Sequence, residues 1–275
     1  MLGRRISNLG SLIVSLALTF LVLTSNIQAA GELDPSFNAA AYGVSYGAAG
    51  VIKEQPDGKI LVGGSFSAAN STAASSLIRL NADGTVDPTF NTQNLFSALG
   101  IGASVFSITV QADGKILVGG IFTATGVVQP GIRRLNSDGS LDTVFTPFVV
   151  SVGSAILDME IQADGKIIAG GAFSGAGIPE NGVRLNPNGS IDPTFASQSG
   201  MTIRDLEIEA DGRIVVVGNE PPDLSIGLVR RLTSAGVPDG SIPSLNINGR
   251  VEVVKLKANG QILIGGAFTS IEGFT

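Results

Sequence analysis

Two acidic residues at equivalent places in neighbouring repeats are the first candidates for catalytic chemistry in this chain. Asp158 and Asp205 each open a strand-like segment, seven residues before the Gly of an Asp-Gly turn. Paired carboxylates are the groups with which glycosidases supply a general acid and a base or nucleophile. The other repeats carry Val51, Ser107 and Val253 at this place, and no substrate-positioning groups accompany the pair. We therefore interpret both residues as solvated acids at strand starts and assign no catalytic residue.

A second group of oxygen-bearing side chains lies in three turns, at Asn81–Asp87, Asn136–Asp142 and Asn186–Asp192. Each turn superficially resembles a calcium loop, because oxygen ligands surround a Gly that allows a sharp turn. The late bidentate Glu of an EF-hand is missing from all three. The alternative is a hairpin turn followed by an Asp-Pro corner, in which Asp side chains bond local backbone N–H groups. We favour the turn, assign no metal ligand and no cofactor, and keep calcium as the less favoured alternative.

The composition removes several classes of chemistry. The 275 residues include no Cys and no His, so a thiol nucleophile, a disulfide framework, a Ser-His-Asp triad and a His-ligated metal are all excluded. The formal net charge is −6, and an acidic surface repels phosphate backbones. Nucleic acid is therefore not an expected partner.

The elements that must position these residues come from a repeat. Asp-Gly or Asn-Gly turns recur at intervals of 56, 51, 47 and 48 residues, with their glycines at Gly58, Gly114, Gly165, Gly212 and Gly260. Such pairs tolerate the positive φ of tight hairpin turns. Apolar and polar residues alternate before each turn, and an unbroken apolar run such as Ile60–Val62 follows it. The pattern predicts one half-buried strand and one fully buried strand per hairpin.

Further signatures extend each hairpin into a larger unit. A Gly-Gly pair, expected to permit a bulge or close backbone approach, precedes a Phe expected to fill the gap between neighbouring units. A second hairpin then follows. The pairs are Gly63–Gly64, Gly119–Gly120, Gly170–Gly171 and Gly265–Gly266; the aromatic residues are Phe66, Phe122, Phe173 and Phe268; and the second hairpins are Arg79–Phe90, Arg134–Phe145, Arg184–Phe195 and a degraded copy at Arg231–Asp239.

Two hairpins every fifty residues or so predict an all-β protein, a β-propeller of four-stranded blades with about five blades present. The innermost strand of a blade lines the channel, so Asp158 and Asp205 are expected near the axis. The segment Leu33–Phe37 reads as the last strand of a blade, whereas Thr275 follows a first hairpin. We therefore expect an incomplete ring: either a short segment closes five blades, or more repeats follow.

The pairing of DGKILVGGxF with RLNxDGxxDxxF resembles the delta-60 repeat family of bacterial extracytoplasmic β-propellers, over essentially all of residues 31–275. This resemblance implies a propeller of unknown biochemical function that is often part of a larger secreted or surface protein. It supplies no catalytic residues.

The first 30 residues have the pattern of a bacterial secretory signal peptide. Arg4 and Arg5 precede the apolar run Leu9–Leu23, and a small-residue site ends at Ala29 and Ala30. The run is short for a membrane span, which needs roughly 20 apolar residues. The alternative is an uncleaved anchor. Cleavage near Ala29 or Ala30 predicts a propeller domain at residues 31–275, secreted or at the cell surface and without a membrane segment.

Together these observations favour an exported, non-catalytic binding or scaffolding module whose partner is an unknown protein or surface ligand. Two alternatives stay open: a carboxylate-based hydrolase or lyase at the channel, and a structural spacer in a longer surface protein. In the fourth repeat, Gly218–Asp223 replaces the double Gly and the Phe. A variant loop on a repeat scaffold either carries a function or results from sequence drift, and we favour sequence drift.

Overall fold

The computed structural model describes residues 44–45, 47–66, 68–69, 72–73, 76–92, 103–122, 129–197, 200–220, 225–242, 245 and 247–271. The chain divides into two compact units, Met1–Phe37 and Asn38–Thr275, and all described residues belong to the second. The signal-peptide pattern and the Leu33–Phe37 segment lie outside the described residues. A search of the described ranges finds no helix with the length and apolar character to span a membrane.

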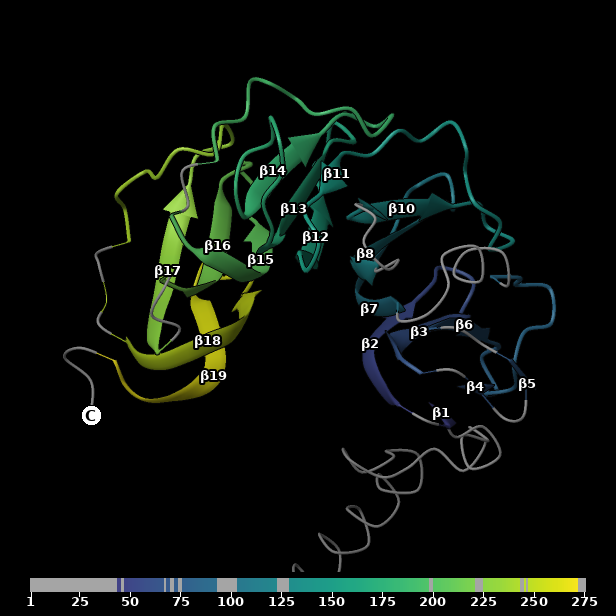
Figure 1. Ribbon diagram of the computed structural model, residues 1–275. Helices are drawn as coiled ribbons and strands as arrows, with labels where there is room; N and C mark the ends of the chain where they lie inside the picture. The colour runs from purple at the N-terminus through teal and green to yellow at the C-terminus, as the bar shows by residue number, and fades with distance from the viewer. Residues whose placement is uncertain are drawn as a thin grey trace, which may run out of the picture. The chain divides into compact units, whose positions relative to one another are not determined.

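Antiparallel sheets follow one another along the chain as blades (Figure 1). Blade 1 is β2 (Ala48–Glu54), β3 (Ile60–Ser65) and β6 (Leu77–Leu80); blade 2 is β7 (Ala103–Val110), β8 (Ile116–Phe122) and β10 (Ile132–Leu135); blade 3 is β12 (Ala155–Ile161), β13 (Ile167–Ala172) and β14 (Gly182–Leu185). Blade 4 is β15 (Thr202–Ile208), β16 (Ile214–Asn219) and β17 (Ile226–Leu232), and blade 5 is β18 (Ile247–Leu256) and β19 (Ile262–Ile271). The last strand of blade 4, β17, pairs with the first strand of blade 5, β18. Two small sheets join β1 (Val44–Ser45), β4 (Ala68–Ala69) and β5 (Thr72–Ala73), and β9 (Gln129–Pro130) with β11 (Val149–Val150).

The fold is the all-β, blade-forming architecture expected of the repeat, but the fourth strand of each blade is reduced. It persists as isolated bridges, Leu80↔Val86, Leu135↔Leu141, Leu185↔Ile191 and Leu232↔Pro238. The next residue in blade 1, Asp87, still bonds back to the third strand through its N–H, which donates to the Arg79 carbonyl. Pro88 then lacks an N–H with which to continue the ladder. The second hairpin is therefore a tight turn followed by a corner.

The predicted turns form because their glycines adopt a backbone conformation that other residues avoid. The five marker glycines have φ between 79° and 85°. In the first of these turns the Gly58 N–H donates to the Gln55 carbonyl at 2.9 Å, and the Asp57 carboxylate accepts from the Lys59 N–H at 3.1 Å. The Asp-Gly pair thus supplies both the positive φ and the side-chain acceptor of the hairpin.

The two glycines of each pair allow close contacts with different neighbours. A Cβ on Gly63 would lie 2.7 Å from Val105 Cγ1 of the next blade, whereas a Cβ on Gly64 would lie 2.1 Å from the Ala48 carbonyl oxygen of its own blade. That second approach occurs where the inner strand bulges, between Ala49 and Val51. The expected bulge and backbone contact are both confirmed. In blade 4, where Val217 replaces the first glycine, Gly218 remains at the backbone contact.

The apolar core lies between successive blades. Leu61 and Leu77 of blade 1 pack with Val105, Ile108 and Phe122 of blade 2 in one cluster. Equivalent clusters join blades 2 and 3, blades 3 and 4, and blades 4 and 5. Phe122 and Phe173 are buried in these clusters and Phe268 packs at the edge of the last, as their expected gap-filling role requires.

The outer faces of the first and last blades lack this cover at two positions. Ile52 is 68% exposed, although its counterpart Ile108 in blade 2 is 4% exposed. Leu263 of blade 5 is 53% exposed, although its counterpart Leu61 is fully buried. Among the described residues, no strand ladder joins blade 5 to blade 1.

Candidate functional site

The structure brings Asp158 and Asp205 together across two blades. Each follows a bulge in its inner strand, between Ile156 and Asp158 in β12 and between Ile203 and Asp205 in β15. The Leu206 N–H lies 3.1 Å from Asp158 Oδ2 and 3.0 Å from Asp205 Oδ1, so one donor serves both carboxylates. The expected convergence is therefore observed.

Both carboxylates also bond to flanking blades. Asp158 Oδ1 accepts from the Ser107 hydroxyl of blade 2 at 3.3 Å. Asp205 Oδ2 accepts from the Val254 N–H of blade 5 at 2.7 Å. The expectation of solvated acids is thus wrong: both side chains are partly buried, and their hydrogen bonds connect the inner strands of four blades. Bulges re-aim side chains, and here they turn both carboxylates toward backbone donors of the next strand.

The surroundings of Asp158 favour its protonated form. Burial raises the pKa of Asp158 well above its ordinary value, and the negative charge of Asp205 and a hydrogen bond to its carboxyl raise it further. N–H donors from Met159 and Leu206 oppose this shift without cancelling it. Asp158 therefore keeps its proton at pH values where an ordinary Asp is ionised. A carboxyl group that keeps its proton in this way is what a general acid requires.

A second layer of charged residues lies two residues further along the same strands. The Lys255 ammonium donates to Glu207, which raises the pKa of Lys255. Burial raises the pKa of Glu160, and the charge of Glu207 adds to the shift, while Lys53 and Lys255 oppose it. These residues were not among the candidates predicted from the sequence. A signal was available, because Lys53, Glu160, Glu207 and Lys255 all stand five residues before a marker glycine.

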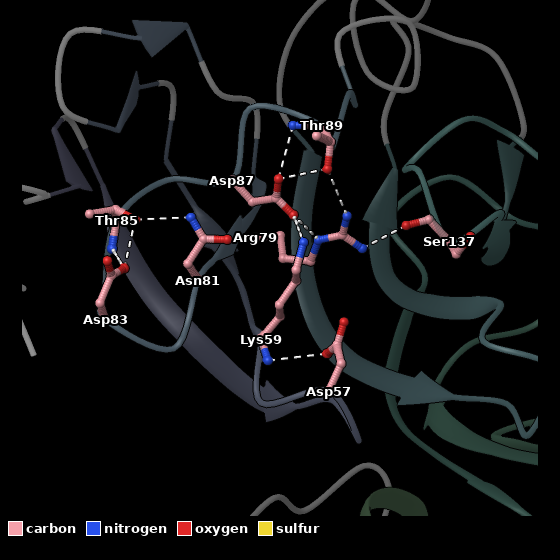
Figure 2. Close-up of polar contacts among 9 residues, drawn as sticks. All are labelled: Asp57, Lys59, Arg79, Asn81, Asp83, Thr85, Asp87, Thr89 and Ser137. Carbon is pink, nitrogen blue, oxygen red and sulfur yellow. Dashed lines mark hydrogen bonds and ion pairs between the residues drawn. The ribbon is translucent and has the colours of Figure 1, made fainter.

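The Asp87 turn of blade 1 is a closed network of protein donors (Figure 2). Asp87 Oδ2 accepts from Arg79 Nε and Lys59 Nζ, both at 2.7 Å, and Oδ1 accepts from the Thr89 N–H and hydroxyl at 2.9 and 2.6 Å. Burial alone would raise the pKa of Asp87, but the hydrogen bonds from Lys59, Thr89 and Arg79 hold it well below its ordinary value. Asp83, in the same turn, accepts from the Thr85 N–H at 2.9 Å.

The same arginine also connects successive blades. Arg79 Nη1 donates to the Ser137 carbonyl of blade 2 at 2.6 Å (Figure 2). The Arg79 guanidinium also lies 4.5 Å from the centre of the Phe90 ring. Arg134 and Arg184 repeat the arrangement toward the carbonyls of Pro187 and Ser234, both at 2.5 Å. The RLN and Asp-x-x-Phe parts of the repeat therefore form a latch from each of blades 1 to 3 to the blade that follows it.

These contacts bear on the two interpretations of the turns. The oxygens of Asp87, Asp142 and Asp192 bond to Lys and Arg side chains, and the turn Asp side chains bond local backbone N–H groups, as the hairpin interpretation predicted. In the part of the chain that the structure describes, no group of three acidic side chains is placed to hold a metal ion.

The variant segment of blade 4 is described as far as Glu220. Asn219 is fully buried, and its Oδ1 accepts from Arg204 Nε at 2.7 Å. Arg204 Nη1 in turn bonds Glu252 of blade 5 at 3.0 Å. This polar bridge to the next blade starts one residue before Glu220, which takes the position of the Phe of the other blades. The bridge could not be predicted from the sequence, because Asn219 and Arg204 lie in different strands.

Residues 55–90, 111–145 and 162–195 match the family described as domain of unknown function (DUF5122) beta-propeller. The chain matches no curated protein sequence.

Solved structures similar to this chain include the WD40 β-propeller domain of Doa1, at 17% identity and a TM-score of 0.46, over 78% of this chain and 60% of that one. PorZ of Porphyromonas gingivalis, described as an essential bacterial surface component of the type-IX secretion system, is similar at 13% and 0.47, over 84% of this chain and 33% of that one. Virginiamycin B lyase from Staphylococcus aureus is similar at 15% and 0.45, over 82% and 72%. At these identities and TM-scores, no function is transferred from them.

Proposed function

We propose that this chain, which carries repeats of the DUF5122 β-propeller family, is an exported, non-catalytic binding or scaffolding module of a secreted or cell-surface protein. Its partner in this proposal is a protein or surface ligand rather than nucleic acid, in keeping with the net charge of −6. The N-terminal pattern that ends at Ala29 and Ala30 supports export.

One observation carries the proposal: the polar residues that recur in the repeat form hydrogen bonds and ion pairs that hold neighbouring blades together. Arg79, Arg134 and Arg184 each bond an Asp of their own blade and a carbonyl of the next blade. A motif that serves blade-to-blade contacts builds a scaffold, and function on a repeat scaffold resides in residues that differ between repeats.

Export is tested by expressing the full chain in a bacterial host and sequencing the N-terminus of the protein found outside the cytoplasm. A new N-terminus at residue 30 or 31 supports the proposal. Retention of the whole chain in the cytoplasm refutes it. A chain in which Arg4 and Arg5 are replaced by Glu serves as the matched control, because it leaves the propeller repeats unchanged.

A carboxylate-based hydrolase or lyase at the inner strands is the second candidate, favoured by the raised pKa of Asp158 beside the carboxyl of Asp205. The full chain and its Asp158→Ala, Asp205→Ala and Ser107→Ala variants are screened on glycosides and esters. Turnover that either Asp variant abolishes, and that Ser107→Ala retains, establishes the enzyme and refutes the non-catalytic proposal. Turnover that survives both Asp substitutions excludes this pair as its source.

A further inference from the structure

Blade 2 contains a cavity of about 270 Å³ beside its third strand, β10. Ile132 and Arg134 of β10 belong to one wall, and residues between Leu141 and Pro147 of the returning segment form the other. Leu141 is 43% exposed, so the rim of the cavity reaches the protein surface. In the sheet of blade 2, β10 lies at the opposite edge from the inner strand β7, so the cavity is separate from the inner-strand carboxylates.

The main chain of β10 presents one carbonyl group to this cavity. Successive residues of a strand direct their main-chain groups alternately to its two sides. The Arg134 carbonyl points away from β8, because it accepts from the N–H of Asp142 in the returning segment at 2.9 Å. Ile132 stands two residues earlier, so its carbonyl points the same way. Because Ile132 is fully buried and lines the cavity, its carbonyl is a buried acceptor at the cavity wall.

The equivalent carbonyl of blade 1 has a donor within its own blade. The Leu77 carbonyl accepts from the Thr92 hydroxyl at 3.2 Å. In blade 2 the place of Thr92 is taken by Pro147, which lines the cavity and has neither a hydroxyl nor an N–H. Among the described residues, no hydrogen bond from a side chain or a turn replaces this donor at Ile132. A buried carbonyl without a partner costs free energy, which a bound donor would recover.

The charged residues around the cavity do not require an ionic ligand. Arg134 pairs with Asp142 at 2.8 Å, so these two charges compensate each other. The Arg133 guanidinium packs on the Phe122 ring, 5.3 Å from its centre, and Phe122 is not among the described residues that line the cavity. The rest of the lining is mainly apolar and includes Ile132, Leu141, Phe145 and Pro147. The cavity therefore offers an apolar lining with one uncharged acceptor.

We propose that this cavity binds a small neutral alcohol. The hydroxyl of the ligand donates to the Ile132 carbonyl, as the Thr92 hydroxyl does to the Leu77 carbonyl in blade 1, and its hydrocarbon part packs against Leu141 and Pro147. The volume lies below the roughly 300–1,000 Å³ of sites for drug-sized ligands, so a ring or chain of about six carbon atoms is the expected size. The inference goes beyond the proposed function, because ligand binding by the purified chain depends on neither export nor attachment to a surface protein.

The test is a titration of the ¹⁵N-labelled full chain with cyclohexanol and with cyclohexanone, followed by amide chemical shifts. Cyclohexanone has a ring of the same size, but it cannot donate a hydrogen bond. We expect saturable shifts at Ile132, Leu141 and Thr143 with cyclohexanol, and binding of cyclohexanone weaker by about fivefold or more, as loss of one neutral hydrogen bond implies. Equal affinity for the two probes overturns the proposal. The absence of saturable shifts also overturns it, and is the result expected if water alone fills the cavity.

Two substitutions at one position separate the hydrogen bond from the shape of the cavity. Pro147→Thr installs the residue of blade 1 and supplies an internal donor to the Ile132 carbonyl, so cyclohexanol binding should weaken by about fivefold or more. Pro147→Val is the matched control, because Val has the shape of Thr without its hydroxyl, and it should keep the preference for cyclohexanol over cyclohexanone. Dispersion of the amide spectrum verifies that both variants fold.

Equal cyclohexanol affinities of the two variants would refute the assignment of the Ile132 carbonyl as the partner of the ligand. If either variant fails to fold, the comparison of the two probes on the unmodified chain still supports or overturns the proposal.

Discussion

Removing Arg79 should destabilise the protein far more than removing Lys59, although both cations bond the same oxygen at the same distance. Each lies 2.7 Å from Asp87 Oδ2 (Figure 2). Their surroundings differ: the Arg79 side chain is 7% exposed and that of Lys59 is 30% exposed, while the Asp87 side chain is 2% exposed. The two pairs therefore differ in burial, although the distance to the shared oxygen is the same.

The magnitudes follow from what each truncation leaves behind. Arg79→Met leaves a buried carboxylate and breaks the bond to the Ser137 carbonyl and the contact with Phe90. Breaking a buried pair in this way costs about 3–5 kcal/mol, and the remaining Lys59 favours the lower end of that range, about 3 kcal/mol. Lys59→Met removes a partly solvated cation while Arg79 still pairs with Asp87, so the expected cost is about 1 kcal/mol or less.

Thermal and urea unfolding followed by far-ultraviolet circular dichroism provide the measurement, since the chain has no Trp. At roughly 2–4 °C per kcal/mol for a domain of this size, Arg79→Met should lower the melting temperature by about 6–12 °C and Lys59→Met by about 4 °C or less. The urea slope should stay unchanged, so that the midpoint alone reports the free energy of unfolding. Lys59→Arg, which keeps the charge, is the control. Equal losses for the two Met variants would refute the argument that burial sets the energy of this network.

Three further perturbations test other parts of the structure. Because the pKa of Asp158 is raised in the folded state, the free energy of unfolding should fall as pH rises from about 4 through that raised pKa. Asp158→Asn should remove this pH dependence and raise the free energy of unfolding by about 1–2 kcal/mol at neutral pH, measured from urea midpoints between pH 5 and 8. Gly171→Ala places a Cβ 2.1 Å from the Ala155 carbonyl oxygen and should cost about 1–3 kcal/mol or more in the same assay; an unchanged midpoint would mean that the bulge adjusts freely. Ile108→Thr should lower the free energy of unfolding by about 2 kcal/mol, because the Ile108 side chain is 4% exposed. Ile52→Thr, at the equivalent position and 68% exposed, should change it by no more than about 0.5 kcal/mol, and comparable losses for the two variants would show that blade 1 is covered in solution.

The turns and the double glycines could be predicted from the sequence because their chemistry is local. Asp57 and Gly58 specify one hairpin by themselves, through a positive φ and a side-chain acceptor. The bulge opposite Gly64 was also predictable, since a glycine inside a strand marks close backbone approach. The period of the repeat then placed the inner strands, and with them Asp158 and Asp205, beside one another.

Other features depend on partners that leave no mark in the sequence. The target of Arg79 is a backbone carbonyl of the next blade, and every residue has one, so nothing identifies Ser137 in advance. The fourth strand was overestimated for a related reason. Val86 forms a β-bridge with Leu80, but the next residue, Asp87, bonds the side chains of Lys59 and Arg79 instead of continuing a strand. Which of these contacts forms depends on the tertiary structure and not on the local sequence.

The latches explain why the best-marked residues say least about function. Because Arg79, Arg134 and Arg184 are each committed to an Asp and to the next blade, selection on folding alone accounts for their recurrence. Residues that break the repeat are under no such constraint from the common scaffold. Function on this scaffold is therefore to be sought at positions at which one blade departs from the others.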